Sequence, residues 1–405
     1  MKILLINKYF YPKGGAENSF FQTAKLLERY GHSISFFSMQ DERNLPTEYS
    51  RYFVSRVEYD KPGVGQSIKA AGRLLYSWES RRNIERLIQD QKPDLAHLNN
   101  IYHQISPSIL HSLKKFCVPV VMTLRDYKIV CASYSMIADG KICEACKDGR
   151  HYQCFLKKCV KDSRVKSLLN TLEMYLHHKI LRIYDLVDVF ISPSRFLKDK
   201  MQAMGFKGRI EVLPNFVDHG DFLPRYGAAE RLICYVGRLS KEKGVATLID
   251  AMKLLPGVQL KVIGDGPLRG KLEEKCRKEG IKNVVFLGYQ TGEDLKREMS
   301  NPLFVVIPSE WYENNPRSVI EAFALGKPVV GARIGGIPEL VKGGETGLLY
   351  ESGNVEDLRD KIEALLKDKE RIEFMGRNAR KFVETELNTD LHYEKLMKIY
   401  QSVMK

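Results

Sequence analysis

Two glutamates, Glu313 and Glu321, lie eight positions apart on either side of an expected helix start. The apolar run 303–307 predicts a buried strand that ends in the polar loop carrying Glu313. Asn315 and Pro316 are expected as the N-cap and a first-turn residue of the helix that carries Glu321. Backbone N–H groups at a helix start suit a diphosphate, and ionised carboxylates accept hydrogen bonds from vicinal hydroxyls. The pattern predicts a sugar-nucleotide site, and two solvated acids are the alternative.

Glycines in loops after other expected strands could bring backbone amides close to an anion. Gly14 and Gly15 follow the first apolar run and precede a helix-like segment. Paired glycines there would let amides approach a phosphate closely, although a flexible turn explains an isolated Gly-Gly equally well. Gly264 follows the run 259–263, and turn chemistry alone is the alternative for this glycine.

Two cations follow the run 232–236, the first expected strand of the second half. The guanidinium of Arg238 and the ammonium of Lys243 could neutralise a leaving diphosphate, as a metal ion does elsewhere. The chain carries no Asp-X-Asp motif, which is typical of metal-bound diphosphate. The sequence therefore predicts ligand contact by both cations and no cofactor for catalysis. Two solvated loop cations are the alternative.

Short apolar runs alternate with helix-like stretches in both halves of the 405-residue chain. Buried parallel strands have this pattern, so the sequence predicts two doubly wound α/β domains, 1–215 and 216–388, followed by a last helix, 389–405. Ligands of such domains bind at the carboxyl ends of the strands, where the residues named above are expected. The expected strands are 3–6, 33–37, 95–98, 118–124 and 187–191, then 232–236, 259–263, 284–287, 303–307 and 328–331.

These motifs resemble those of the retaining GT-B glycosyltransferases, specifically glycosyltransferase family 4, and the resemblance extends over nearly the whole chain. It implies two Rossmann-like domains that face each other across a cleft, the first binding an acceptor and the second a nucleoside diphosphate-sugar donor. It implies that Glu313 contacts hydroxyls of the donor sugar and that Glu321 contacts the ribose. Asn314 and Asn315 are implied where backbone amides approach the sugar and the phosphates. The helix 389–405 is implied to pack back on the first domain.

Arg125 and Asp126 stand where the family usually has a His-Asp pair. An Arg cannot serve as a general base because it does not deprotonate in proteins. Arg125 is expected instead to hydrogen-bond a sugar hydroxyl, or to pair with an acidic sugar or a phosphorylated acceptor. Arg125, Asp126 and Glu313 are the expected catalytic-site residues. No carboxylate is named as a nucleophile, so the working hypothesis is a same-face mechanism in which the leaving phosphate assists the incoming hydroxyl.

The formal net charge of +14 implies attraction to polyanions, which include nucleic acid, anionic membranes and phosphate-bearing substrates. Two segments place basic residues beside apolar and aromatic ones: Lys157, Lys158, Lys161, Arg164 and Lys166 before the run 168–184, and Lys69, Arg73, Arg81, Arg82 and Arg86 beside Leu74, Leu75, Tyr76 and Trp78. Such segments resemble helices that rest on a bilayer, and core-packing helices with a solvated cationic face are the alternative. The hypothesis is that the first half docks on an anionic membrane.

The first apolar run is too short for a signal peptide or a membrane span, and no segment reaches the roughly 18 apolar residues of a spanning helix. A cytoplasmic location is therefore expected, with the eight cysteines as thiols or metal ligands. Cys143, Cys146, Cys154 and Cys159 form a plausible four-thiolate structural zinc site. An iron–sulfur cluster would need the same ligands, and loose thiols are the alternative.

Together these observations predict transfer of a sugar from a nucleoside diphosphate-sugar to a saccharide or lipid-linked acceptor. The resemblance implies a setting in capsule, exopolysaccharide or lipopolysaccharide assembly. A sugar-nucleotide epimerase or a phosphorylase on the same scaffold is the enzymatic alternative, since fold does not determine reaction. A nucleic-acid-binding protein would use the basic surface but would leave Glu313 and Glu321 without purpose, so nucleic acid is not an expected partner.

Overall fold

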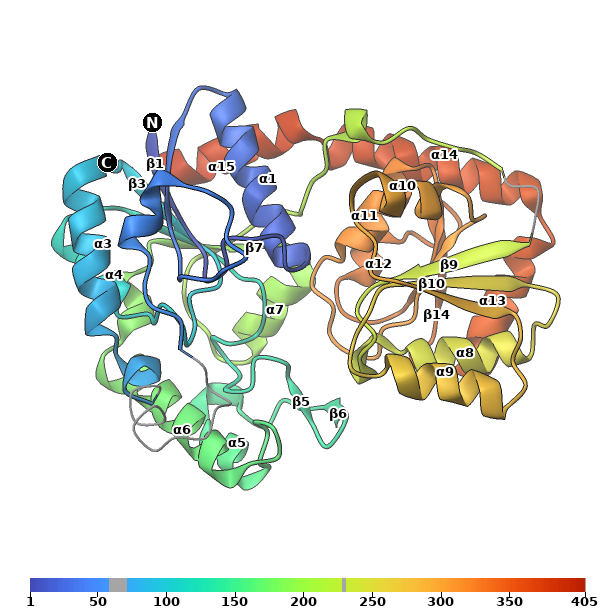
Figure 1. The fold of residues 1–405 in the computed structure, drawn as a ribbon, viewed down its shortest axis with the longest axis horizontal. Helices are drawn as coiled ribbons and strands as arrows, with labels where there is room; N and C mark the ends of the chain where they lie inside the picture. The colour runs from blue at the N-terminus through green and yellow to red at the C-terminus, as the bar shows by residue number, and fades with distance from the viewer. Residues whose placement is uncertain (58–70, 228–230, 405) are drawn as a thin grey trace. The chain divides into compact units, whose positions relative to one another are not determined.

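Strands that are apolar on both faces must be covered by helices on both sides, and both halves of the chain fold in this way (Figure 1). The computed structural model describes residues 1–57, 71–227 and 231–404. The chain divides into unit 1, which comprises Met1–Leu213 and Tyr393–Lys405, and unit 2, which comprises Pro214–His392. Each unit contains a six-stranded parallel sheet, so the predicted α/β fold with two doubly wound sheets is confirmed.

The sheet of unit 1 has the strand order β2-β1-β3-β4-β7-β8. Its strands are β1 (Lys2–Ile6), β2 (Ser33–Phe37), β3 (Leu95–Leu98), β4 (Val120–Thr123), β7 (Val189–Ser192) and β8 (Ile210–Val212). The central strands β3, β4 and β7 are buried along their whole length. The edge strand β8 was not predicted because its three residues are too short a run to recognise. A hairpin of β5 (Ile137–Ala138) and β6 (Lys141–Ile142) forms a separate small sheet.

Three helices of unit 1 begin at serine caps. The hydroxyls of Ser77, Ser163 and Ser194 each accept a hydrogen bond from the N–H three residues later and so start three of these helices. The helices are α1 (Gly15–Arg29), α3 (Trp78–Gln91), α4 (Ile109–Lys115), α5 (Tyr152–Leu156), α6 (Arg164–Tyr175), α7 (Arg195–Ala203) and α15 (Thr389–Gln401), with the short turns η1 (Glu48–Tyr52), η2 (Lys147–Gly149), η3 (Leu176–Ile180) and η4 (Ile183–Leu186). In the described part of the chain, none is long and apolar enough to cross a membrane.

The C-terminal helix α15 packs on the sheet of unit 1, far from it in sequence. The buried hydroxyl of Tyr400 lies 2.7 Å from His97 Nδ1 on β3, and His97 Nε2 lies 2.7 Å from the hydroxyl of Thr123 on β4. Tyr393 stacks on Tyr30 with 3.6 Å between ring centroids. His97 is therefore a packing residue of the core.

The sheet of unit 2 has the strand order β11-β10-β9-β12-β13-β14. Its strands are β9 (Leu232–Val236), β10 (Gln259–Ile263), β11 (Val284–Gly288), β12 (Val305–Ile307), β13 (Val329–Ala332) and β14 (Gly347–Tyr350). The helices are α8 (Val245–Lys253), α9 (Arg269–Lys278), α10 (Gly292–Ser300), α11 (Arg317–Ala324), α12 (Ile337–Leu340), α13 (Val355–Leu366) and α14 (Lys369–Glu386), with the turns η5 (His219–Asp221) and η6 (Lys241–Lys243). β14 was not predicted because it begins with a glycine, Gly347. A Cβ at this position would lie 1.9 Å from the carbonyl oxygen of Val329.

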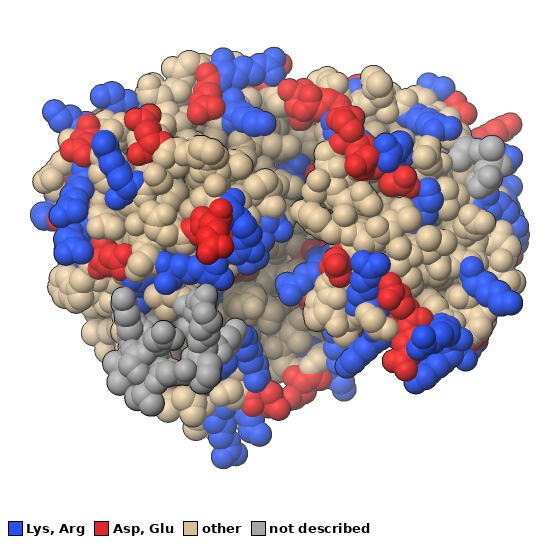
Figure 2. Space-filling model, viewed as in Figure 1, with Lys and Arg blue, Asp and Glu red and all other residues tan. Residues whose placement is uncertain are grey.

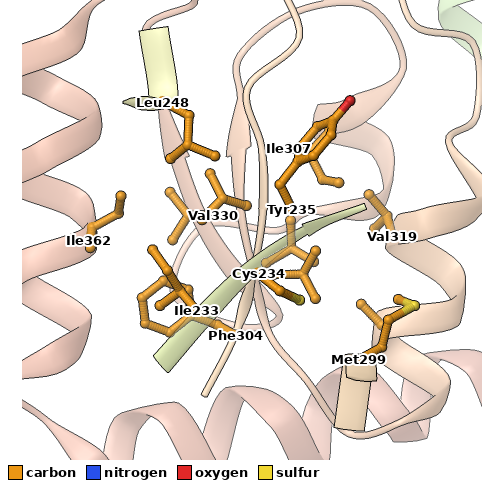
Figure 3. Close-up of a cluster of buried hydrophobic side chains, with 14 of the residues drawn as sticks. Ile233, Cys234, Tyr235, Leu248, Met299, Phe304, Ile307, Val319, Val330 and Ile362 are labelled. Carbon is orange, nitrogen blue, oxygen red and sulfur yellow. The ribbon is translucent and has the colours of Figure 1, made fainter. Parts of the chain in front are cut away.

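The hydrophobic core of unit 2 surrounds β9, which lies between β10 and β12. Figure 3 shows Leu248 of α8 and Ile362 of α13 on one side of this strand, and Met299 of α10 and Val319 of α11 on the other. All four side chains are fully buried or nearly so. The core thus holds the carboxyl ends of the strands in fixed positions, and the loops that carry the predicted site follow directly from these ends.

Candidate functional site

Glu313 lies in the loop between β12 and α11 and forms a buried ion pair. Its Oε1 accepts hydrogen bonds from Lys243 Nζ at 2.6 Å and from the hydroxyl of Ser309 at 2.7 Å. The Glu313 residue is only 6% exposed. Burial on its own raises the pKa of Glu313, but the charge of Lys243 and the hydrogen bonds from Lys243 and Ser309 outweigh it and leave the pKa below its ordinary value. The structure therefore keeps this carboxylate ionised in a place where carboxyls otherwise tend to be neutral.

A glycine in the left-handed region brings Lys243 to Glu313. Gly244 has a φ of 64°, and a Cβ there would lie 1.8 Å from the carbonyl oxygen of Pro308 at the end of β12. A residue with a side chain would collide with this carbonyl oxygen. The turn η6 can therefore pack against the end of β12 only with glycine at position 244. The ion pair thus depends on a backbone contact between two loops.

A second glycine supports Glu313 from the other side. Gly335, in the turn between β13 and α12, has a φ of 60°, and its Cβ would lie 2.3 Å from the carbonyl oxygen of Glu313. The N–H of Gly336 donates to the same carbonyl oxygen at 2.7 Å. Gly335 and Gly336 therefore fix the backbone of Glu313. In the sequence, the sign of this role was that the two glycines follow the expected strand 328–331.

Gly264 is a glycine because it packs against the neighbouring loop too closely for a side chain. Its φ is 136°, and a Cβ would lie 1.9 Å from the carbonyl oxygen of Gly237 in the neighbouring loop. The loops after β9 and β10 are thereby packed together. Arg238 follows Gly237 and is exposed, while its carbonyl oxygen accepts a hydrogen bond from the hydroxyl of Tyr235 at 2.9 Å. The structure thus brings Lys243 to Glu313 and leaves Arg238 facing solvent.

The predicted start of α11 was wrong by one residue. The helix begins at Arg317 with Pro316 at the N-cap, and no side chain caps it. Asn315 does not act as the cap because it is buried against the chain at Asn215: its Oδ1 accepts from the N–H of Asn215 and its carbonyl oxygen accepts from the Asn215 amide, both at 2.9 Å. Asn315 therefore ties α11 to the segment that enters unit 2.

The first turn of α11 carries a cation beside Glu321. Arg317 donates from Nη2 to Glu321 Oε1 at 3.0 Å, one helical turn away, and both side chains are largely covered. Asn314, between the two glutamates, is half-buried. The buried indole of Trp311 lies close enough to Glu313 to help hold the pKa of that carboxyl below its ordinary value.

In unit 1, Gly14 and Gly15 start α1 but do not require the conformational freedom of glycine. Gly14 is extended, with a φ of −175°, and a Cβ there would come no nearer than 3.8 Å to the carboxylate of Glu17. A Cβ at Gly14 would therefore make only ordinary van der Waals contact with Glu17. Glu17 was not among the predicted site residues; it is buried, and burial raises its pKa. Its place one turn after the glycines was the available signal.

Arg125 and Asp126 lie in the loop after β4. Arg125 Nε donates to Asn99 Oδ1 at 3.0 Å, and Asp126 Oδ1 accepts from the N–H of Lys128 at 2.9 Å. Burial raises the pKa of Asp126, against the opposing effects of the Lys128 N–H and of nearby lysines. Below this loop, Lys128 Nζ lies 2.7 Å from Glu173 Oε2, and both side chains are almost fully buried. Sequence reasoning missed this ion pair because its partners are far apart in the chain.

The cysteine-rich segment folds so that thiols meet around one small cavity. Cys143, Cys146, Cys154 and Cys159 line a space of ≈ 10 Å³ together with Cys131, and all eight cysteines are free. Burial raises the pKa of Cys146 to about 12. Among residues 1–57, 71–227 and 231–404, no group of three or more His, Cys, Asp and Glu side chains is arranged to hold a metal ion. The zinc site therefore stays a prediction.

Two family models match the chain, Glycosyltransferase Family 4 over residues 13–221 and Glycosyl transferases group 1 over residues 226–382. The chain belongs to glycosyltransferase family 4. An uncharacterized glycosyltransferase of Methanocaldococcus jannaschii is 32% identical to this family 4 enzyme over 388 residues, covering 94% of this chain and 93% of that protein. An uncharacterized 42.6 kDa protein in the cps region of Klebsiella pneumoniae is 29% identical over 354 residues, covering 84% and 87%.

Solved structures share the fold of this family 4 enzyme at low sequence identity. Sucrose-phosphate synthase from Thermosynechococcus elongatus has a TM-score of 0.73 at 19% identity, covering 99% of this chain and 98% of its own. HepE of Anabaena, in complex with UDP and glucose, has a TM-score of 0.69 at 18% identity, covering 99% and 100%. The predicted two-domain GT-B fold is thereby confirmed.

Proposed function

We propose that this glycosyltransferase moves a hexose from a nucleoside diphosphate-sugar to a saccharide or lipid-linked acceptor, with retention of anomeric configuration and without a catalytic metal. The bond between the anomeric carbon and the leaving phosphate oxygen breaks, and a bond from the acceptor hydroxyl forms on the same face of the sugar. The acceptor proton passes to the leaving phosphate. No protein carboxylate is required as a nucleophile in this scheme.

The observation that carries the proposal is the buried contact between Lys243 and Glu313 at the end of β12. A sugar donor presents hydroxyls and a diphosphate close together, so its site needs an ionised acceptor and a cation side by side. Glu313 supplies the acceptor. Lys243, whose side chain is 24% exposed, supplies the cation and can reach an incoming phosphate. The exposed Arg238 in the preceding loop adds a second positive charge.

The neighbouring groups support the same ligand. Glu321 is held by Arg317 at the start of α11, which suits the proposed contact with ribose hydroxyls. Asn314 lies between the two glutamates, and the buried indole of Trp311 lies close to Glu313. In unit 1, the helix start at Gly14 suits a phosphate. Arg125 would contact a hydroxyl or an acidic group of the substrate.

The relatives support a setting in cell-surface polysaccharide assembly. The Klebsiella pneumoniae protein is encoded in a cps region, and another relative, 30% identical over 185 residues, is the capsular polysaccharide biosynthesis glycosyltransferase CapM of Staphylococcus aureus. CapM is matched over 43% of this chain and 47% of its own length. The structure of HepE holds UDP and glucose, which favours a UDP-sugar as the first donor to test.

The proposal is tested by thermal shift against UDP-, GDP-, ADP- and TDP-sugars with and without EDTA, since a ligand that binds only the folded state raises the melting temperature. One donor should stabilise the protein in EDTA as well as without it. The anomeric configuration of the product made from that donor is then read by NMR. Donor binding that is abolished by EDTA would overturn the metal-free proposal, and an inverted product would overturn retention.

A phosphorylase or an epimerase on the same fold predicts other products. Release of a sugar 1-phosphate from a saccharide and inorganic phosphate would indicate the first, and conversion of one sugar nucleotide into another without any acceptor would indicate the second. Membership of glycosyltransferase family 4 favours transfer over both.

A further inference from the structure

Helix α6 of unit 1 is amphipathic, but its apolar face is exposed and its polar face is buried. Val165, Leu168 and Leu172 recur at intervals of three and four residues, which places them on one face of the helix. This apolar face is exposed: Val165 is 78% and Leu172 is 52% accessible. The opposite face is buried although most of it is polar, and it consists of Ser167, Asn170, Thr171, Glu173 and Met174.

The buried polar face of α6 makes polar contacts with other parts of unit 1. Glu173 pairs with Lys128 at 2.7 Å, and the same ammonium lies 3.3 Å from Asn170 Oδ1. The hydroxyl of Thr171 donates to the carbonyl oxygen of His151, outside the helix, at 3.3 Å. Because these contacts fix which side of α6 faces inward, the helix cannot turn its apolar side into the core.

The elements that adjoin α6 carry further exposed apolar side chains. Tyr152 and Leu156 are exposed on α5, which packs directly against α6, and Ile180 is 72% accessible at the end of η3, which continues from α6. Single exposed apolar residues are common on protein surfaces, but a group of six within 29 consecutive residues marks an interaction surface. We call these six residues the α6 face: Tyr152, Leu156, Val165, Leu168, Leu172 and Ile180.

The charge around the α6 face is predominantly positive. Between residues 152 and 180 there are six basic residues, Lys157, Lys158, Lys161, Arg164, Lys166 and Lys179, and two acidic ones, Asp162 and Glu173. Glu173 is buried in its ion pair and does not reach the surface. Figure 2 shows Lys and Arg side chains at the end of unit 1 that carries α5 and α6. An occupant of the α6 face must therefore combine an apolar layer with negative charge.

We propose that the α6 face docks unit 1 on an anionic lipid bilayer, with the apolar side chains among the acyl chains and the surrounding lysines at the headgroups. Interfacial helices bind by this combination of buried apolar area and electrostatic attraction to anionic lipid. Arg73 takes no part, contrary to the sequence-based hypothesis, because it is buried and pairs with Glu79. Lys69 lies outside the described residues. The inference goes beyond sugar transfer, since docking needs no donor.

The test is co-sedimentation of the full chain with vesicles of phosphatidylcholine alone and of phosphatidylcholine with phosphatidylglycerol, at low and at high salt. Binding is expected only with phosphatidylglycerol, and high salt should weaken it. The variant Val165→Ser with Leu172→Ser should reduce the partition coefficient between vesicles and water about tenfold or more. It removes two apolar side chains that the bilayer would bury. Lys157→Gln with Lys161→Gln should have an effect of similar size.

The matched control is Leu223→Ser, which removes an apolar side chain of unit 2 that is even more exposed. It should bind vesicles like the wild type. Equal binding of the Val165→Ser, Leu172→Ser variant and the wild type would overturn the proposal. Equal binding to neutral and to anionic vesicles would also overturn it. A dimer or an oligonucleotide complex that this variant loses, while its vesicle binding persists, would overturn it as well. Because no donor is present, failure of docking and failure of sugar transfer are distinguishable.

Discussion

Lys243 Nζ lies 2.6 Å from Glu313 Oε1, although 70 positions separate the two residues in the chain. The contact joins the loop after β9 to the loop after β12, two strands that are neighbours in the sheet of unit 2. It places a cation and an ionised, largely buried carboxylate at the carboxyl end of a parallel sheet, where ligands of such sheets bind. This relationship makes the proposed donor site open to direct test.

Lys243→Ala should lower kcat about 10²-fold or more, because it removes a charge that would stabilise the leaving diphosphate. It should also lower the melting temperature, since it leaves the buried Glu313 without its partner. The double variant Lys243→Ala with Glu313→Gln should recover the melting temperature but not the activity. Lys241→Ala, an exposed lysine in the same turn, is the control and should behave like the wild type. Recovery of activity in the double variant would rule out the proposed role of the pair.

Gly244→Ala should destabilise unit 2 by about 3 kcal/mol or more, because the new Cβ meets the carbonyl oxygen of Pro308 and the backbone stays at a positive φ. Gly257→Ala is the matched control, since its Cβ meets nothing within 4 Å and its φ is not in the left-handed region. Urea unfolding of both variants measures the difference. Equal stability would mean that the turn η6 does not pack on β12 in this way.

The stability of unit 1 should fall as the pH is lowered below 6.5 because of His178. Burial, and then the charges of His151, His177 and Lys128, lower the pKa of His178 to about 3, while Glu173 opposes this shift. Between these two pH values the unfolded chain binds a proton at this position and the folded chain does not, so acid favours unfolding. His178→Gln should flatten the dependence of the unfolding free energy on pH between 6.5 and 5. An unchanged slope would contradict this assignment.

The thiol pocket should bind zinc once Cys143, Cys146, Cys154 and Cys159 close on one ion. To bind zinc, the cysteine side chains would have to move closer to one another, since thiolate sulfur lies about 2.3 Å from zinc. After anaerobic purification, elemental analysis should find close to one zinc per chain, and Cys143→Ser with Cys146→Ser should lose it. Cys117→Ser, an exposed cysteine outside the pocket, is the control. Less than about one metal atom per ten chains would discard the zinc site and leave a pocket of thiols.

Much of the fold could be predicted because buried parallel strands are recognisable one at a time. Each is a short apolar run bounded by turn residues, and all ten predicted runs overlap a strand of the structure. Two strands of the six-stranded sheets were missed: β8 is very short, and β14 begins with a glycine. The predicted cap at Asn315 failed because a side chain chooses its partner in three dimensions: Asn215, a hundred positions away, takes the hydrogen bonds that a cap would make.

The sequence by itself determined the family, the alternation of strands and helices, and which loops follow the strands, because these depend on local composition and on motifs of short spacing. Only the tertiary structure decided which of those side chains meet. It paired Lys243 with Glu313, engaged Lys128 with Glu173, gathered five thiols around one cavity and turned the apolar face of α6 outward. Contacts of this kind depend on which strands become neighbours and on close approaches that glycine alone permits, as at Gly244. No local pattern in the chain contains that information.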